Sequence, residues 1–108
     1  MKKTICFDID NVICITGKNK NYKKSIPIIK NIKTINLLYE KGHKIIIFTA
    51  RYMGRCNGNV SLVKKKIKPL TVLQLKKWGV KYHKLYLGKP SYDLFIDDKA
   101  MFFKKNWS

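Results

Sequence analysis

Two carboxylates stand two residues apart at the end of the first apolar run of the chain. The run begins at Ile5 and is typical of a strand buried on both faces. Asp8 and Asp10 follow one another at the side-chain period of a strand, so both project to the same side. Like charges at the end of a buried strand are costly unless a cation or a phosphoryl group uses them. An Asp10-Asn11 pair also commonly begins a turn, and that interpretation stays open at this point.

Polar residues follow three further apolar runs. The four run ends carry Asp8 and Asp10, Thr49 and Arg51, Lys89, and Asp97 and Asp98. Parallel strands joined by right-handed crossovers place their carboxyl ends at one edge of the sheet, which is where ligands bind. Two carboxylate pairs would form an all-oxygen site suited to Mg²⁺ with several retained waters. A threonine hydroxyl and a lysine charge beside such a site predict phosphoryl transfer.

The elements that position these residues alternate along the chain. Apolar runs predict strands at the first run and at residues 44–48, 85–87 and 93–96. Helical periodicity predicts a helix from residue 28 to 39, and two shorter helices at 60–66 and 69–79. Residues 12–15 and 22–26 flank a polar stretch and predict a hairpin or flap over the site; 53–59 is a predicted loop and 100–107 a short helix or tail. The predicted fold is a single α/β domain over residues 1–108, a three-layer, Rossmann-like parallel sheet.

The composition bounds the class of protein. The chain has 108 residues, a formal net charge of +18, and 22 lysines against two arginines. Such charge favours anionic partners, but nucleic-acid sites usually recruit more arginine, so a lysine bias spread over solvated faces is the competing interpretation. Four of the six acidic residues fall in the two aspartate pairs, which favours a cation site. Three cysteines without zinc spacing, no long apolar segment and no cleavage site lead us to expect a cytoplasmic protein.

The ordered motifs resemble those of the haloacid dehalogenase (HAD) superfamily. Asp8-Ile-Asp10, Thr49, Lys89 and the run Leu94-Phe-Ile-Asp-Asp98 look like its four motifs, in order. The segments 49–51, 57–60 and 88–100 look further like a small capless branch of capsule or polysaccharide biosynthesis phosphatases. The resemblance covers nearly the whole chain.

The resemblance implies a role for each motif residue. Asp8 would attack phosphorus and form an aspartyl-phosphate, and Asp10 would protonate the leaving alcohol and then activate water. Mg²⁺ would bind the Asp8 carboxylate, the Asp10 main-chain carbonyl and Asp97 or Asp98. Thr49 and Lys89 would hold the phosphoryl group. The expected substrate-binding residues are Asn11, Thr49, Ala50, Arg51, Asn57, Asn59 and Lys89, although Arg51, Asn57 and Asn59 would equally serve to shape a loop.

The gaps between the motifs leave no room for a cap domain, so the site is expected to be open unless the flap at residues 13–24, the loop at 52–59 or a second subunit covers it. The expected activity is that of a Mg²⁺-dependent phosphomonoesterase acting on a small phosphorylated sugar, polyol or amino alcohol of surface-polysaccharide synthesis. A polynucleotide or nucleotide phosphatase is the alternative favoured by charge. A non-catalytic, basic phosphate-binding module is the third possibility.

Overall fold

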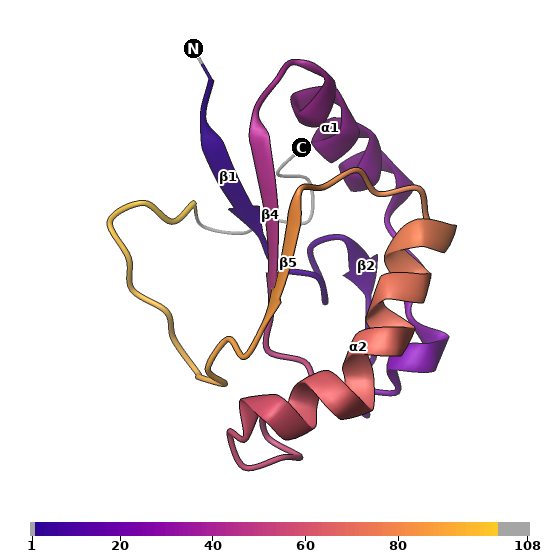
Figure 1. Ribbon diagram of the computed structural model, residues 1–108, viewed down its shortest axis with the longest axis vertical. Helices are drawn as coiled ribbons and strands as arrows, with labels where there is room; N and C mark the ends of the chain where they lie inside the picture. The colour runs from indigo at the N-terminus through magenta and orange to yellow at the C-terminus, as the bar shows by residue number, and fades with distance from the viewer. Residues whose placement is uncertain (1, 102–108) are drawn as a thin grey trace.

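A three-stranded parallel sheet forms the centre of the computed structural model, which describes residues 2–101 (Figure 1). Its strands are β1 (Thr4–Phe7), β4 (Lys44–Thr49) and β5 (Lys84–Leu87), in the order β1-β4-β5. The register aligns Phe7 with Ile47 and Thr49 with Leu87, so the carboxyl ends of the strands lie at one edge. The predicted parallel arrangement of these three strands is confirmed.

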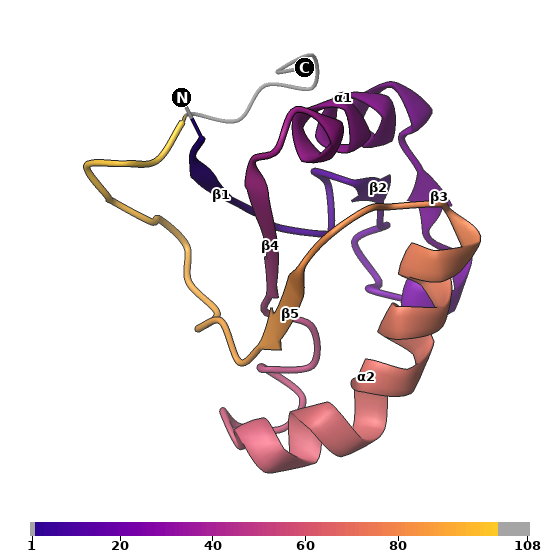
Figure 2. The same cartoon turned by 45° about the horizontal axis from the view of Figure 1, so that its top comes forward.

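Both helices lie on the same side of the sheet in two views, α1 (Ile29–Glu40) above and α2 (Val60–Lys77) to the right (Figures 1 and 2). Ile32 and Ile35 of α1 join Ile45 and Ile47 of β4 in one buried cluster, because every second residue of β4 faces the helices. On the other face Cys6 is exposed. The α/β class is confirmed, but the described residues form two layers and not the expected three.

A small hairpin lies between the first strand and α1, as predicted. Strands β2 (Cys14–Ile15) and β3 (Ile26–Pro27) pair antiparallel, and the single 3-10 turn η1 (Tyr22–Lys24) lies between them. We call residues 12–27 the flap. The Ile28 N–H donates to the Ile13 carbonyl at 2.8 Å, which fixes the flap to the start of α1. The flap lies on the helix side of the sheet (Figure 2).

A single helix replaces the two that the sequence predicted after residue 59. Pro69 lies inside α2 and cannot donate a hydrogen bond to the preceding turn, and the helix bends in its middle part (Figure 1). The buried face continues across the bend from Val63 and Ile67 to Leu75. Packing of that continuous face outweighs the hydrogen bond lost at the proline, so the prediction of two helices was wrong.

The chain leaves the sheet after β5. Gly88 has φ 93°, which favours glycine, and Pro90 has no N–H to offer a strand partner. Residues 93–96 form no strand, contrary to prediction, and Ile96 is 86% exposed. The segment curves out from the sheet on the side away from the helices (Figures 1 and 2). An apolar run becomes a strand only with a backbone partner, and none pairs with this run within residues 2–101.

The expected helix or tail at 100–107 lies almost wholly outside the described residues. Ala100 and Met101, the two residues of it that are described, are not helical. Within residues 2–101, no helix combines the length and apolar character needed to cross a membrane.

Candidate active site

The ends of the three sheet strands bring Asp8, Thr49 and Lys89 together. Asp8 directly follows β1, and its Oδ2 lies 3.4 Å from the Lys89 Nζ, two residues beyond β5. Thr49 ends the central strand and is fully buried, and its carbonyl accepts a hydrogen bond from the Lys89 N–H at 3.2 Å. The Asp8 side chain remains 33% exposed and that of Lys89 15% exposed. A solvent-accessible carboxylate thus faces an ammonium group at the edge where ligands are expected.

Burial and charge act in opposite directions on Asp8 and Lys89. Burial raises the pKa of Asp8, and Asp10 adds to the rise, while Lys89 and the Ile9 N–H act to lower it. Burial by itself would lower the pKa of Lys89, but Asp8 and Tyr92 together raise it above its ordinary value. An ion pair is expected to lower the carboxyl pKa; at 3.4 Å the contact is too long to offset the loss of water around Asp8.

Asp10 is held by a buried arginine. The Arg51 Nε lies 3.0 Å from Asp10 Oδ2, and Arg51 Nη2 lies 2.9 Å from Oδ1, so the guanidinium binds the carboxylate through two nitrogens. The Thr16 hydroxyl donates to the same Oδ1 at 2.6 Å. The Arg51 side chain is completely buried, whereas that of Asp10 is 20% exposed. The arrangement fixes the orientation of Asp10 while leaving it an accessible edge.

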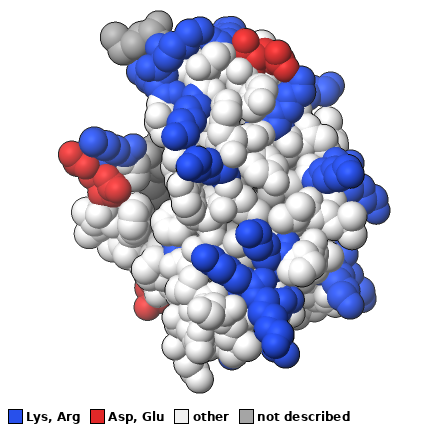
Figure 3. All heavy atoms as spheres, in the orientation of Figure 1, with Lys and Arg blue, Asp and Glu red and all other residues white. Residues whose placement is uncertain are grey.

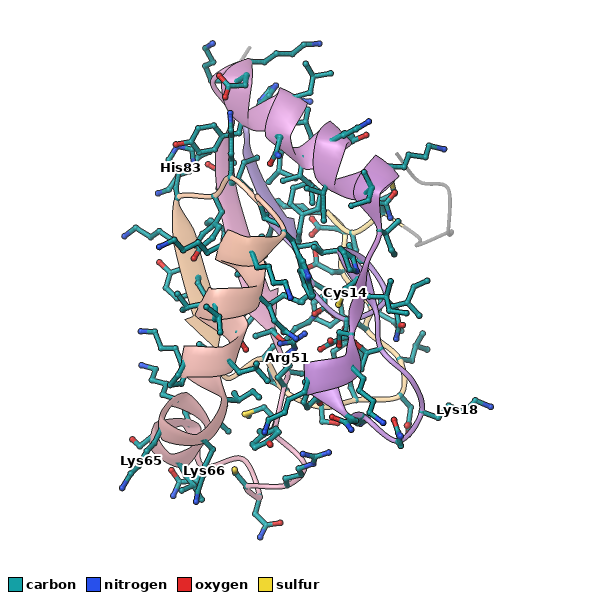
Figure 4. The ribbon with its side chains drawn as sticks, turned by 90° about the vertical axis from the view of Figure 1, so that its right-hand side faces the viewer. Cys14, Lys18, Arg51, Lys65, Lys66 and His83 are labelled. Carbon is teal, nitrogen blue, oxygen red and sulfur yellow. The ribbon has the colours of Figure 1, made fainter. Side chains whose placement is uncertain are left out.

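Arg51 also connects α2 with the flap (Figure 4). Its Nη1 donates to Gln74 Oε1 at 2.6 Å and to Thr71 Oγ1 at 3.2 Å, both on α2. The guanidinium carbon lies 4.8 Å from the centre of the Tyr22 ring, and the Gln74 Nε2 donates to the Tyr22 carbonyl at 2.6 Å. Arg51 was expected to bind substrate or shape a loop. Its burial and its partners favour a role in holding Asp10 in place.

Sequence reasoning did not single out Thr16, Thr71 or Gln74. Thr71 and Gln74 occupy buried positions of α2 that continue the spacing set by Val63 and Ile67. Polar residues at core positions of an amphipathic helix need a polar partner, and this signal was available in the sequence. The partner itself, an arginine after a distant strand, could be identified only from the structure.

The remaining expected substrate-binding residues separate into two groups. Asn11 and Ala50 line a hollow of about 280 Å³ that also contains Asp8 and Asp10. Asn57, with φ 51°, and Asn59 are exposed on the loop before α2 and are not among the residues that line this hollow. The Asn59 Oδ1 accepts the Leu62 N–H at 3.1 Å and caps α2. Of the two roles expected for Asn59, binding substrate or shaping the loop, this contact favours the second.

Asp97 and Asp98 do not join the other carboxylates. Both are exposed, and Asp97 Oδ1 accepts the Lys99 N–H at 2.8 Å, a bond that lowers the pKa of Asp97. Within the described part of the chain, His, Cys, Asp and Glu side chains form no group of three or more that would hold a metal ion. Asp8 and Asp10 are therefore the acidic residues brought to the candidate site.

Comparisons with known proteins add a structural likeness. No family model matches the chain, and no curated protein matches it. The fold is similar to the crystal structure of a structural-genomics target from Vibrio cholerae, with a TM-score of 0.84 and 29% sequence identity. The likeness covers 94% of this chain and 83% of that one. The likeness supports the α/β architecture, and the function has to be inferred from the site.

Proposed function

We propose that this chain is a Mg²⁺-dependent phosphomonoesterase of the HAD type, without a cap domain, that works through an aspartyl-phosphate on Asp8. The observation that carries the proposal is the meeting of Asp8 and Lys89 at 3.4 Å, beside Thr49, at the carboxyl edge of a parallel sheet. These residues come from three separate strand ends and match the first three motifs of the resemblance.

Each residue has a physical task in this reaction. Asp8 is accessible and would attack phosphorus in line, while Lys89 would pair with a phosphoryl oxygen and offset the charge of the carboxylates. The hydroxyl of Thr49 accepts the Arg51 N–H at 3.1 Å, which fixes the turn that presents this strand end. Asp10, oriented by Arg51 and Thr16, would give a proton to the leaving alcohol and take one from the hydrolytic water.

The described donors fit a magnesium ion in part. The partly exposed Asp8 carboxylate and the Asp10 main-chain carbonyl would hold it, and Mg²⁺ ordinarily keeps several waters. When bound, the ion would supply positive charge to the transferring phosphoryl group. A further ligand from Asp97 or Asp98 would require residues 93–98 to lie along the free edge of β1, which is an edge strand of the described sheet.

The substrate class follows from the resemblance of the 49–51, 57–60 and 88–100 segments. It suggests a small phosphorylated sugar, polyol or amino alcohol of capsule or surface-polysaccharide synthesis. The hollow of about 280 Å³ at the candidate site is of the size that suits a small substrate.

Phosphate release from a panel of sugar, polyol and amino-alcohol phosphates, with Mg²⁺ and with chelator, tests the proposal. We expect metal-dependent release that the Asp8→Asn variant loses by at least about a thousand-fold, because the nucleophile is absent. Circular dichroism of the variant checks that it is folded. A fully active Asp8→Asn protein contradicts the assignment, and metal and phosphate binding without turnover would favour the non-catalytic module.

The net charge favours one alternative, a polynucleotide or nucleotide phosphatase. On the face in Figure 3 the basic side chains are spread over several elements, with no single stripe that would follow a nucleic-acid backbone. Phosphorylated oligonucleotides belong in the same panel for this reason. If they exceed every sugar phosphate as substrates, and binding weakens steeply with salt, the alternative is preferred.

A further inference from the structure

A second, larger hollow adjoins the candidate active site. It has a volume of about 530 Å³ and lies between the flap and the loop after β4. Its lining residues are Asn19, Lys20, Asn21, Tyr22, Lys23, Tyr52, Arg55 and Leu70. Lys20, Tyr22, Tyr52 and Arg55 also line the hollow that contains Asp8 and Asp10, so the two hollows are continuous. We call the larger one the outer hollow and the one that contains Asp8 and Asp10 the inner hollow.

A direct contact between the flap and the loop after β4 forms the border between the two hollows. The Arg55 Nη2 donates to the Lys20 carbonyl at 2.9 Å, which joins the flap to the loop. The Arg55 guanidinium lies 4.6 Å from the centre of the Tyr52 ring and 5.5 Å from that of Tyr22. The two rings lie 5.6 Å apart. Stacking on aromatic faces restrains the exposed guanidinium, so its position is set before any ligand binds.

The backbone is unusual at the same border. Lys20 has φ 52° and Tyr52 has φ 64°, a left-handed conformation that non-glycine residues rarely adopt. Asn11, which lines the inner hollow, has φ 66°. Such conformations persist only where the surrounding contacts hold them, and they gather at binding sites. Three of the four such residues in the described chain line one of the two hollows.

The charges of the outer hollow are of one sign. Lys20, Lys23 and Arg55 line it, and no acidic residue does. Within residues 2–101, the ion pairs use Arg51, Lys81 and Lys89, so Lys20 and Arg55 take part in none of them. Both acids of the inner hollow already have cationic partners. The positive charge at the border is therefore available to a ligand.

We propose that the outer hollow binds a second anionic group of the substrate, so that the preferred substrate is a small phosphomonoester carrying a carboxylate or a second phosphate away from the scissile phosphate. Arg55 would bind that anion with its remaining N–H donors, since a guanidinium has five. Lys20 would add charge, and the Tyr52 ring would contact the carbon skeleton between the two anions. This inference rests on the proposed function, because it extends the same site.

A matched substrate pair tests the proposal. Sorbitol 6-phosphate and 6-phosphogluconate differ only in the group at the far carbon, a hydroxymethyl in one and a carboxylate in the other. We expect kcat/KM to favour 6-phosphogluconate by about ten-fold or more, as a charge-assisted bond provides. Arg55→Gln should bring the ratio close to one. Lys65→Gln, an exposed change on α2 whose side chain points away from the site in Figure 4, removes the same charge and should keep the ratio.

A fructose phosphate pair, the 1,6-bisphosphate and the 6-phosphate, distinguishes a second phosphate from a carboxylate. No preference for the doubly charged member of either pair, or a preference that Arg55→Gln leaves unchanged, overturns the proposal. A phosphorylated oligonucleotide that exceeds both pairs also overturns it. Calorimetric titration of the same ligands into Asp8→Asn protein distinguishes failure of this proposal from failure of the proposed function. If no substrate is turned over, tighter binding of the doubly charged ligands that is lost in Asp8→Asn/Arg55→Gln still supports an anion site in the outer hollow, and its absence overturns that site.

Discussion

Replacing Arg51 by methionine should destabilise the protein strongly, because the change leaves buried polar groups without their partner. The guanidinium is completely buried and binds the Asp10 carboxylate through two nitrogens. Its third nitrogen donates hydrogen bonds to Thr71 and Gln74. Removing one partner of a buried pair costs about 3–5 kcal/mol. The Asp10 side chain is 20% exposed and regains some water, so we expect the lower end, about 3 kcal/mol.

Urea unfolding followed by circular dichroism measures this loss of free energy. The midpoint temperature of thermal unfolding should fall by about 12–24 °C, because each kcal/mol shifts it by about 4–8 °C. Arg55→Met is the matched control. Arg55 is exposed, and losing its contacts should cost less than about 1 kcal/mol. A loss below about 1 kcal/mol for Arg51→Met would refute the argument that the buried pair holds Asp10.

A double-mutant cycle separates the charge pair from the remaining contacts. Asp10→Asn removes the carboxylate that Arg51→Met leaves unpaired, so the double variant should be more stable than the sum of the two single losses implies. We expect a coupling of at least about 1 kcal/mol, as for other residues in direct contact. Strict additivity would place the cost in the Thr71 and Gln74 contacts on α2.

Two further predictions concern stability. Burial raises the folded-state pKa of Asp8 above its unfolded value of 3.8. The neutral carboxyl therefore contributes its full stability below pH 3.8, and this contribution is lost as the pH rises through the folded-state pKa. Asp8→Asn should therefore become more stable relative to the parent as the pH rises above 3.8 in chelator, and a constant difference between their free energies of unfolding over that rise would contradict this. Gly88→Ala should lower the free energy of unfolding by about 1–3 kcal/mol, because φ is 93° and the added Cβ would lie 3.1 Å from the Val60 side chain. Gly54→Ala, which meets nothing within 4 Å and has no positive φ, is its control and should be close to neutral; equal losses would refute the strain argument.

Local pattern determined much of this fold. The apolar runs that begin at Ile5 and Ile45 predict two parallel strands, and both form, although the described residues cover only one face of the sheet and leave Cys6 exposed on the other. The periodicity over 28–39 places α1, and the polar stretch between short apolar pairs places the flap. Asp8, Thr49 and Lys89 were predicted to meet because parallel strands share a carboxyl edge, and the structure brings them together.

The tertiary structure decided what depends on a partner distant in the chain. Whether Pro69 ends a helix or bends one depends on the packing of the buried face on either side of it. Whether residues 93–96 form a strand depends on pairing with a free sheet edge, and in the described chain they curve away from the sheet unpaired. Arg51 illustrates the same limit: its type and position suggested a ligand for substrate, but its partners lie 41 residues before it and 23 after it. Spacing along the sequence carries no information on such distant contacts, since they are fixed only when the helix, flap and sheet pack together.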